Sequence, residues 1–341
     1  MPHFVGLDAS KATTSICVLD QDGETIREGV VPTEPKAIVA FLRGERRRYR
    51  RVGLESMSMA SWLYEGLARA GLPVICIESR HAHGVLKARL NKTDRNDARG
   101  IAELMRVGVY KAVHVKTIAS QQSKMLLTAR RHLLKKCVDV DNFIRGALLQ
   151  LGIKIKRGRT YAFAKDIEAL TPAARAVRQV INSLMMVRRS IETEVRVLTK
   201  RIGELVAEDE VCRRFMTVPG VGPLTALSFR AAIDVPGRFR HSREVGVHLG
   251  LTPRRFSSGT IDRGGRISKC GDAATRASLF LAAQSMLRTG TRGNWLKSWG
   301  LSIAASRGRG KAIVAVARRI ATILHRMWVD GTDFRNEPRA A

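Results

Sequence analysis

Acidic and aromatic residues are both scarce in this sequence, and each shortage narrows the class of protein. Aspartate and glutamate total 30 against 60 lysines and arginines, a formal net charge of +30 over 341 residues. Such a charge needs counter-charge, and a polyanion is the natural source. The alternative is a general surplus for solubility, although small domains ordinarily carry a net charge of about 2–8. Aromatic residues make up only 5%, which argues against a base-stacking platform as the main binding mode.

Cysteines are few, and long apolar runs are absent. The five cysteines are scattered and form no C-x-x-C pair, which argues against a zinc site or a disulfide framework and fits a reducing cytoplasm. No run of about 18 apolar residues occurs, so we expect no membrane span. The chain starts directly on a strand-like pattern, so we expect no signal peptide. Hydrophobic residues still make up 45%, which is enough to form a core.

Three regions differ in their hydrophobic pattern and predict three domains. Residues 1–115 show three leading strands and then strands alternating with helices, which is typical of an α/β fold with a mixed sheet. Residues 116–210 have helical periodicity and almost no strand signal. Residues 211–341 are expected to be mostly helical, apart from a loop rich in glycine and arginine.

A seven-residue apolar repeat runs through the middle region from Val177 to Leu205, with a companion set that begins at Ile181. This a/d pattern predicts a coiled-coil helix over about four heptads. Arg188 occupies one a position and is expected to weaken the seam locally. We expect a dimerisation domain, and the alternative is a helical hairpin whose seam packs within its own domain.

Four carboxylates fall where strand and helix patterns could bring them together. Asp8 lies at the end of the first predicted strand, in GLDAS, and Glu55 ends a later strand, in GLES. Asp94 and Asp97 are three residues apart on a predicted helix that Thr93 could cap, so both point to one side. Strand ends are where α/β sheets form sites.

Such a cluster would repel itself unless cations were bound. Mg²⁺ prefers carboxylate oxygens, and two ions about 4 Å apart can stabilise both the attacking and the leaving oxygen of a phosphodiester. A simpler role is also open to each carboxylate. Asp94 and Asp97 could complement the helix dipole, Asp8 could form a turn, and Glu55 could be a solvated strand end.

The strings GLDAS, GLES and NKTDRNDARGIAEL resemble the motifs of bacterial insertion-sequence transposases of the IS-one-ten family, which are related to the pilin-gene inverting recombinase. The K-T-D-x-x-D-A-R string is the most distinctive, and it lies about 40 residues after Glu55. The resemblance implies an RNase H-like (RuvC-like) fold for residues 1–115. It also implies a D-E-D-D site in which two Mg²⁺ ions bind to Asp8, Glu55, Asp94 and Asp97.

The family's second signature is similar to VPGVGPLTAL followed by HLGLTPRRFSSGTIDRGGRISKCGD. The resemblance implies that the serine before the glycine, Ser258, is the nucleophile, although the adjacent Ser257 leaves the choice open. A serine hydroxyl needs activation or stabilisation of its product. With no histidine close in sequence, a metal ion could help. The surrounding cations suit a phosphate: Arg254, Arg255, Arg263, Arg266 and Lys269. The alternative is a flexible basic loop whose serines only bind phosphate.

The VPGVGPLTAL string also resembles the turn of a helix-hairpin-helix element. Gly220 and Gly222 could expose backbone N–H groups to a phosphate. An ordinary turn between helices fits the same residues equally well.

The resemblance implies a bacterial, cytoplasmic and nucleoid-associated DNA transposase that forms a homodimer or homotetramer with active sites composed between subunits. A structured non-coding guide (bridge) RNA would pair with donor and target DNA. The expected reaction is DNA cleavage and rejoining through a phosphoserine–DNA intermediate. Two rival functions remain, a metal-dependent nuclease or junction resolvase that uses water, and a non-catalytic nucleic-acid-binding protein.

Overall fold

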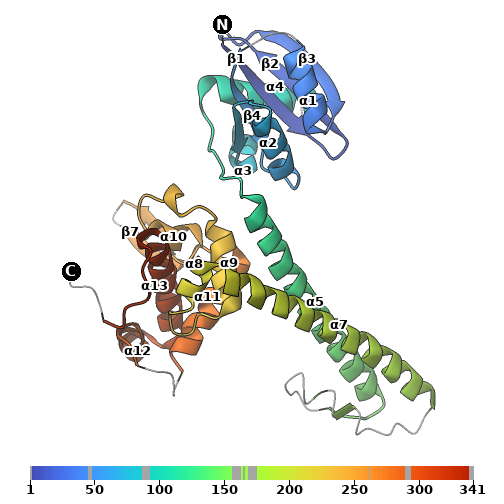
Figure 1. The fold of residues 1–341 in the computed structure, drawn as a ribbon, viewed down its shortest axis with the longest axis vertical. Helices are drawn as coiled ribbons and strands as arrows, with labels where there is room; N and C mark the ends of the chain where they lie inside the picture. Colours follow the sequence, from blue (N-terminus) through green and yellow to red (C-terminus); the bar gives the residue numbers. More distant parts are fainter. Residues whose placement is uncertain are drawn as a thin grey trace. The chain divides into compact units, whose positions relative to one another are not determined.

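A computed structural model describes residues 2–44, 48–86, 93–155, 163, 166–167, 175–259, 261–288 and 293–337 (Figure 1). The chain divides into two compact units, Met1–Lys116 and Thr117–Ala341. Within the described ranges, no helix is both long and apolar enough to cross a membrane.

The N-terminal unit is built on a five-stranded mixed sheet with the order β3-β2-β1-β4-β5. Strands β1 to β3 are antiparallel neighbours, whereas β4 and β5 run parallel to β1. This order and these directions are those of the RNase H-like fold, as predicted. The strands are β1 (Pro2–Ala9), β2 (Thr13–Leu19), β3 (Thr25–Pro32), β4 (Arg48–Glu55) and β5 (Val74–Ile77).

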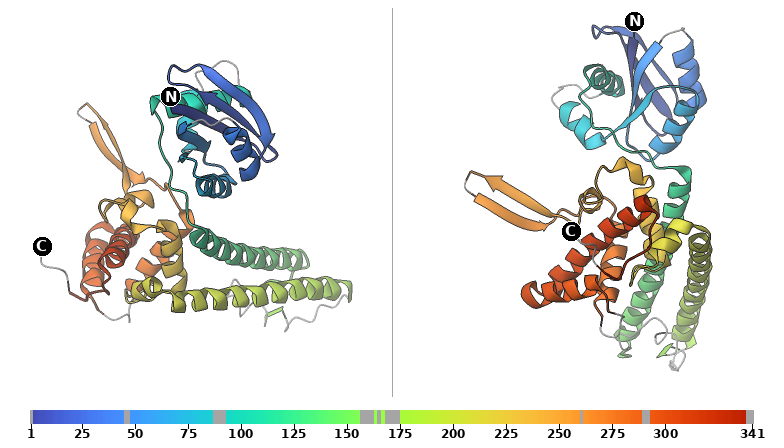
Figure 2. Two further views of the ribbon diagram at one scale, coloured as in Figure 1. Left: turned by 45° about the horizontal axis from the view of Figure 1, so that its top comes forward. Right: turned by 60° about the vertical axis from the view of Figure 1, so that its left-hand side comes forward.

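Helices cover both faces of this sheet. Side chains alternate between the two faces along β1, and the strand has buried apolar residues on each. Val5 and Leu7 are buried against α1 (Pro35–Arg43) and α2 (Ala60–Arg69). Phe4 belongs to a separate cluster with residues of α4 (Asp94–Val107), on the opposite face. The right-hand view of Figure 2 shows the sheet between these layers. A shorter helix, α3 (Ser79–Leu86), follows β5.

Local sequence signals set the ends of these elements. The Asp20 carboxylate accepts hydrogen bonds from the backbone N–H groups of residues 22–24, and Gly23 has φ +93°, which together form the turn between β2 and β3. Thr93 caps α4 as predicted, since its hydroxyl accepts a hydrogen bond from the Asn96 N–H at 3.2 Å. Helix α1 ends at Arg43, and β4 begins at Arg48.

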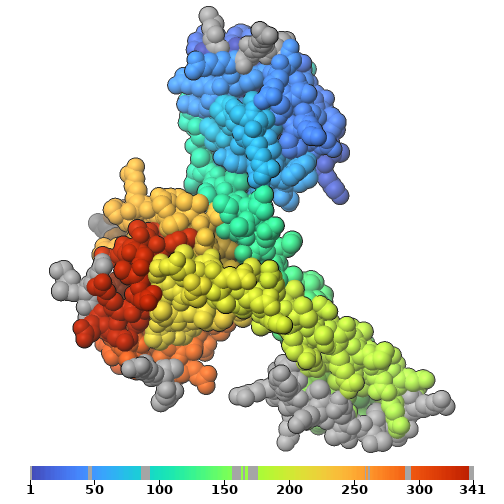
Figure 3. All heavy atoms as spheres, viewed as in Figure 1, coloured from blue at the N-terminus to red at the C-terminus, as the bar shows by residue number. Residues whose placement is uncertain are grey.

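The C-terminal unit begins with two long helices, α5 (Ile118–Gln150) and α7 (Arg175–Glu208), which pack along each other. The residues of the a/d repeat are the least exposed stripe of α7, most of them partly buried, and Ile181 belongs to a cluster that includes Ile144 and Leu148 of α5. The seam thus packs within one chain, as in the hairpin alternative. Figure 3 shows α7, in yellow-green, on the surface of the C-terminal unit.

Arg188 does not interrupt the seam, contrary to the expectation from its charge. Its side chain is fully buried, and its Nε donates a hydrogen bond to the Asp141 carboxylate of α5 at 2.6 Å. Its Nη1 lies 3.0 Å from the Glu192 carboxylate one turn along α7. A buried charge pair of this kind favours one register of the two helices, because every shifted register would leave a charge unpaired.

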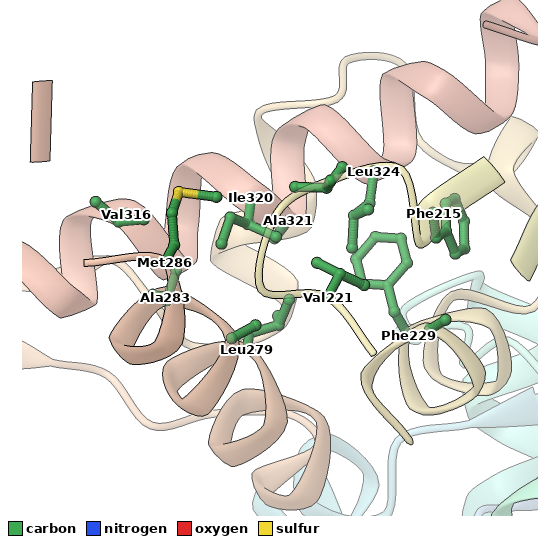
Figure 4. Close-up of a cluster of buried hydrophobic side chains, with 14 of the residues drawn as sticks. Phe215, Val221, Phe229, Leu279, Ala283, Met286, Val316, Ile320, Ala321 and Leu324 are labelled. Atoms are coloured by element: carbon green, nitrogen blue, oxygen red, sulfur yellow. The ribbon is translucent and has the colours of Figure 1, made fainter. Parts of the chain in front are cut away.

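The rest of this unit is a helical body around one core (Figure 4). The long helix α13 supplies Val316, Ile320 and Leu324, which pack on residues of α11 and α9. Phe215 and Phe229 meet edge to face in the same core, with ring centroids 5.4 Å apart. The elements are α8 (Glu210–Phe215), α9 (Pro223–Ile233), η1 (Pro236–Arg238), α10 (Glu244–His248), α11 (Ala273–Met286), α12 (Trp295–Arg307) and α13 (Arg309–Asp330).

The segment predicted as a glycine- and arginine-rich loop is a β-hairpin, which corrects that prediction. Its strands are β6 (Pro253–Ser258) and β7 (Ile261–Ile267), and they pair antiparallel. Figure 2 shows this ribbon, in orange, extending from the helical body. Its residues are mostly exposed on both faces, so the alternation of apolar and polar residues that marks a half-buried strand is missing.

Candidate active site and nucleic-acid interface

Asp8 and Glu55 lie side by side at one edge of the sheet. β1 and β4 are parallel neighbours in which Leu7 pairs with Leu54, so the next residue of each strand is a carboxylate. Both side chains are partly buried. The register alone therefore brings these two predicted site residues to the carboxyl ends of adjacent strands.

Helix α4 lies directly over these strands because glycine allows it to approach. A Cβ on Gly6 would lie 2.0 Å from the Ala98 carbonyl oxygen and 2.3 Å from the Ala102 nitrogen. A Cβ on Gly53, the partner of Gly6 in the ladder, would lie 2.7 Å from Met105 Cγ. At Gly6 the helix backbone, and at Gly53 the Met105 side chain, occupies the space that a Cβ would need, so both positions favour glycine.

The direction of α4 places its first turn at the edge that carries Asp8. Near the other end of the helix, the Met105 carbonyl accepts a hydrogen bond from Arg51 at the start of β4, so α4 runs antiparallel to β1 and β4. Asp94 and Asp97 occupy the first turn, and Asp97 directly precedes Ala98, whose carbonyl oxygen lies over Gly6. Asp94 is exposed and Asp97 is partly buried.

All four predicted carboxylates thus belong to one end of the interface between the sheet and α4. Across the part of the chain that the structure describes, no three His, Cys, Asp or Glu side chains lie close enough together to hold one metal ion. The donor set is nevertheless chemically suited to a hard divalent cation, because it consists of carboxylate oxygens on adjoining elements.

The Cys76 thiol lies near the end of β5 and packs with Val5 and Leu7 on the sheet face that α1 and α2 cover, away from α4. Burial raises its pKa to about 11, with a further contribution from the charge of Glu55. At neutral pH the thiol stays protonated, and a protonated thiol is a poor metal ligand.

The β6–β7 hairpin separates the two candidate serines. Ser257 pairs with Asp262 across the ladder, whereas Ser258, the last residue of β6, pairs with Ile261. Adjacent strand positions belong to opposite faces, so the two serines occupy different faces of the ribbon. Position 258 also adjoins the turn, where Gly259 has φ +58°.

The five predicted cations around the serines differ in what they contact. Arg255 forms a two-pronged ion pair with Asp262, with Nη2 2.6 Å from Oδ2 and Nε 2.9 Å from Oδ1. The Arg255 guanidinium holds the pKa of Asp262 below its usual range. Arg254 donates a hydrogen bond to the Ser268 carbonyl at 3.2 Å. The other three are exposed: Arg263, Arg266 and Lys269.

The base of the hairpin is clamped to the helical body. A Cβ on Gly271 would lie 2.0 Å from the His248 carbonyl oxygen, and Gly271 has φ +69°, so only glycine fits without strain. Arg276 of α11 donates hydrogen bonds to the carbonyls of Leu249 and Cys270 at 3.0 and 2.7 Å. The ribbon is therefore held firmly where it leaves the body.

The turn with Gly220 and Gly222 joins α8 to α9, which both a helix-hairpin-helix-like element and an ordinary turn between helices would require. Gly220 has φ +86°, and a Cβ there would lie 2.4 Å from the Ala282 carbonyl of α11. Packing alone thus accounts for Gly220. Gly222 has no atom within 4 Å of a built Cβ, and its side of the turn is the more open one.

Sequence reasoning missed Asp262, which neutralises one of the predicted phosphate-binding arginines. The signal was present, since Phe256, Ile261 and Ile267 flank a Ser-Gly turn at spacings that fit a short hairpin. Recognising the hairpin would have placed Asp262 opposite Ser257 and diagonal to Arg255.

Comparison with known proteins identifies the family. Residues 5–153 match the IS110 DEDD transposase domain, and residues 212–297 match the domain described as Transposase IS116/IS110/IS902 family. The transposase for insertion sequence element IS1111A of Coxiella burnetii is 30% identical over 334 residues, which cover 94% of this chain and 88% of that protein. The chain belongs to this family of transposases. It is therefore a DNA transposase, and DNA is its substrate.

Two further relatives extend the comparison. A probable family 20 transposase of Pseudomonas aeruginosa is 28% identical, and the transposase for element IS1328 of Yersinia enterocolitica is 24% identical; each alignment covers 83% of this chain and 85% of the relative. The Thermus thermophilus RuvC structure aligns with 33% of this transposase and 99% of its own chain, at 15% identity and a TM-score of 0.25. The first matched domain contains all four carboxylates, and the second contains Ser258.

Proposed function

We propose that this transposase cuts and rejoins DNA with Ser258 as the nucleophile and with Asp8, Glu55, Asp94 and Asp97 as the ligands of divalent metal ions. The observation that supports this most directly is the pairing of Leu7 with Leu54, which puts two carboxylates at adjoining strand ends. The first turn of α4 adds the other two at the same end.

The carboxylates would hold Mg²⁺, in our proposal two ions. Bound there, such ions would offset the negative charge that builds up on a phosphate during strand cleavage. The distance between the strand carboxylates and the α4 aspartates depends on Gly6 and Gly53, because these glycines let α4 pack directly against the strands. Thr93 fixes where the helix begins, and hence where its two aspartates lie.

In the proposed step, the Ser258 oxygen forms a bond to phosphorus and one phosphate ester bond to the adjacent deoxyribose breaks. The serine proton goes to the deoxyribose oxygen that leaves, directly or through water, and the other DNA end stays linked to the protein. Attack by a DNA hydroxyl on this phosphoserine restores the serine and joins the strands. Arginines of the hairpin would stabilise the charge on the phosphate oxygens.

The metal site is tested by the cleavage of a DNA fragment that contains the ends of the native element. We expect Asp97→Asn to abolish cleavage, since it removes one anionic ligand and keeps the size of the side chain. Asp22→Asn is the matched control, because Asp22 is exposed in the β2–β3 turn at the other end of the sheet. Cleavage should also require added Mg²⁺. Equal cleavage by Asp97→Asn and wild type would contradict the assignment.

We further propose that the transposase acts as a homodimer or homotetramer with active sites composed between copies. The carboxylates lie in the first unit and Ser258 in the second, so a complete site needs both units. A mixture of Asp97→Asn and Ser258→Ala proteins distinguishes the two cases. If sites form between copies, the mixture recovers part of the activity that each variant lacks. If every site forms within one chain, the mixture stays inactive.

A structured guide RNA is the other partner that we propose, in a bacterial, cytoplasmic and nucleoid-associated complex. The net charge of +30 is compatible with contact to an RNA as well as to DNA. Sequencing the RNA that co-purifies with the protein from its native locus tests this. We expect one abundant transcript from the element itself. Random fragments of cellular RNA would contradict the proposal.

A further inference from the structure

Phe256 is an exposed aromatic residue that the function proposed above does not use. It lies near the middle of β6, two positions before Ser258, and 60% of its surface is exposed. An exposed phenylalanine forgoes the stabilisation that burial would give. It is the aromatic residue of a ribbon otherwise made of charged, small and aliphatic residues.

One side of the Phe256 ring already has a partner within the hairpin. A Cβ on Gly265 of β7 would lie 3.2 Å from Phe256 Cε2, so the ring rests over this glycine. Covering a strand glycine with an aromatic ring from the neighbouring strand stabilises a hairpin. The contact also fixes the ring in place. The ring's remaining surface is exposed, and the ring–ring and cation–ring contacts of the described residues involve other aromatics.

The charges around Phe256 favour a nucleic acid over an apolar partner. Arg263 pairs with Phe256 directly across the ladder and is exposed. On the opposite face, Arg255 is already bound to Asp262. The face that carries Phe256 is thus bordered by a cation, whereas the other face has an internal ion pair.

We propose that Phe256 is a stacking platform for an unpaired DNA base next to the phosphate that Ser258 attacks. This inference rests on the proposed role of Ser258. Positions 256 and 258 share one face of β6 and are separated by about 7 Å along the strand. Because the ring is already held over Gly265, little conformational entropy is lost when a base binds to its open side. Stacking on the ring then offsets the free energy that a base loses when it leaves the stack of the duplex.

The test uses the full-length Ser258→Ala protein, so that no strand is cut, and a DNA duplex with a short single-stranded gap that contains 5-iododeoxyuridine. Near-ultraviolet light links this base to an aromatic ring stacked on it, and mass spectrometry identifies the linked peptide. We expect linkage at Phe256, retained in Phe256→Tyr and at least tenfold lower in Phe256→Leu. Phe143→Leu is the matched control, because Phe143 on α5 is 61% exposed and far along the chain from the hairpin.

Equal linkage in Phe256→Leu and in the parent protein would overturn the proposal. Linkage to a single-stranded RNA that carries 5-iodouridine, without linkage to the gapped DNA, would also overturn it. Gly265→Ala supplies a second measurement. The added methyl would lie 3.2 Å from Phe256 Cε2 and shift the ring slightly without removing it, so linkage should fall by a smaller factor than in Phe256→Leu. Failure of Ser258 as nucleophile shows instead as a missing protein–DNA adduct in the wild type, so the two failures are distinguishable.

Discussion

Gly6→Ala should inactivate the transposase although it changes no carboxylate. The new methyl would lie 2.0 Å from the Ala98 carbonyl oxygen, which is helix backbone and not the end of a flexible side chain. To reach an ordinary contact of 3.4 Å, α4 must withdraw by about 1.4 Å and carry Asp94 and Asp97 with it. A displacement of about 1 Å at a reacting centre can cost about 100-fold in rate.

The assay compares Mg²⁺-dependent cleavage rates in a graded series of glycine variants. Gly53→Ala should be milder than Gly6→Ala, because its methyl would meet the flexible Met105 side chain at 2.7 Å. Gly84→Ala on α3 has no atom within 4 Å of the new methyl and should match the wild type. Thermal unfolding checks that each variant folds, since overpacking costs about 1–3 kcal/mol. A Gly6→Ala protein that cleaves within twofold of wild type would refute the reasoning.

Three shorter predictions concern other parts of the chain. Arg188→Ala should lower the free energy of unfolding, measured by urea denaturation, by about 3–5 kcal/mol, because it leaves the buried Asp141 carboxylate without its cationic partner. The double variant Arg188→Met and Asp141→Leu removes both charges and should lower it much less. Because folding raises the Cys76 pKa from 9.0 to about 11, its protonated form is favoured by the native state. Stability should therefore be unaffected by this group below pH 9 and fall as the pH rises towards 11, and Cys76→Ala should remove that part of the decline. Gly271→Ala should displace the hairpin base from His248 and reduce the protein–DNA adduct even though Ser258 is intact, whereas an adduct at the wild-type level would argue against a rigid hairpin base.

The sheet of the N-terminal unit was predictable because its local signals agree. The Asp20–Glu24 turn, the cap at Thr93 and the alternation along β1 each specify the same arrangement that the structure contains.

The hairpin and the helical seam show what sequence alone could not decide. β6 and β7 are exposed on both faces, so no burial pattern marked them, and the ion pair between Arg255 and Asp262 depends on their register. The heptad repeat predicted a buried stripe but not its partner, since α5 of the same chain and a second copy would satisfy it equally. Arg188 illustrates this, because its charge has a partner only once Asp141 of α5 is placed beside it.

The most direct test of the central claim is a denaturing gel of wild-type protein incubated with Mg²⁺, its co-purified RNA and end-labelled DNA of its own element. We expect a labelled DNA band that is shifted by the mass of the protein and is sensitive to protease. That band should be lost in Ser258→Ala and retained in Ser257→Ala. Cleaved DNA without any protein-linked species, or a linked species that persists in Ser258→Ala, would contradict the serine mechanism.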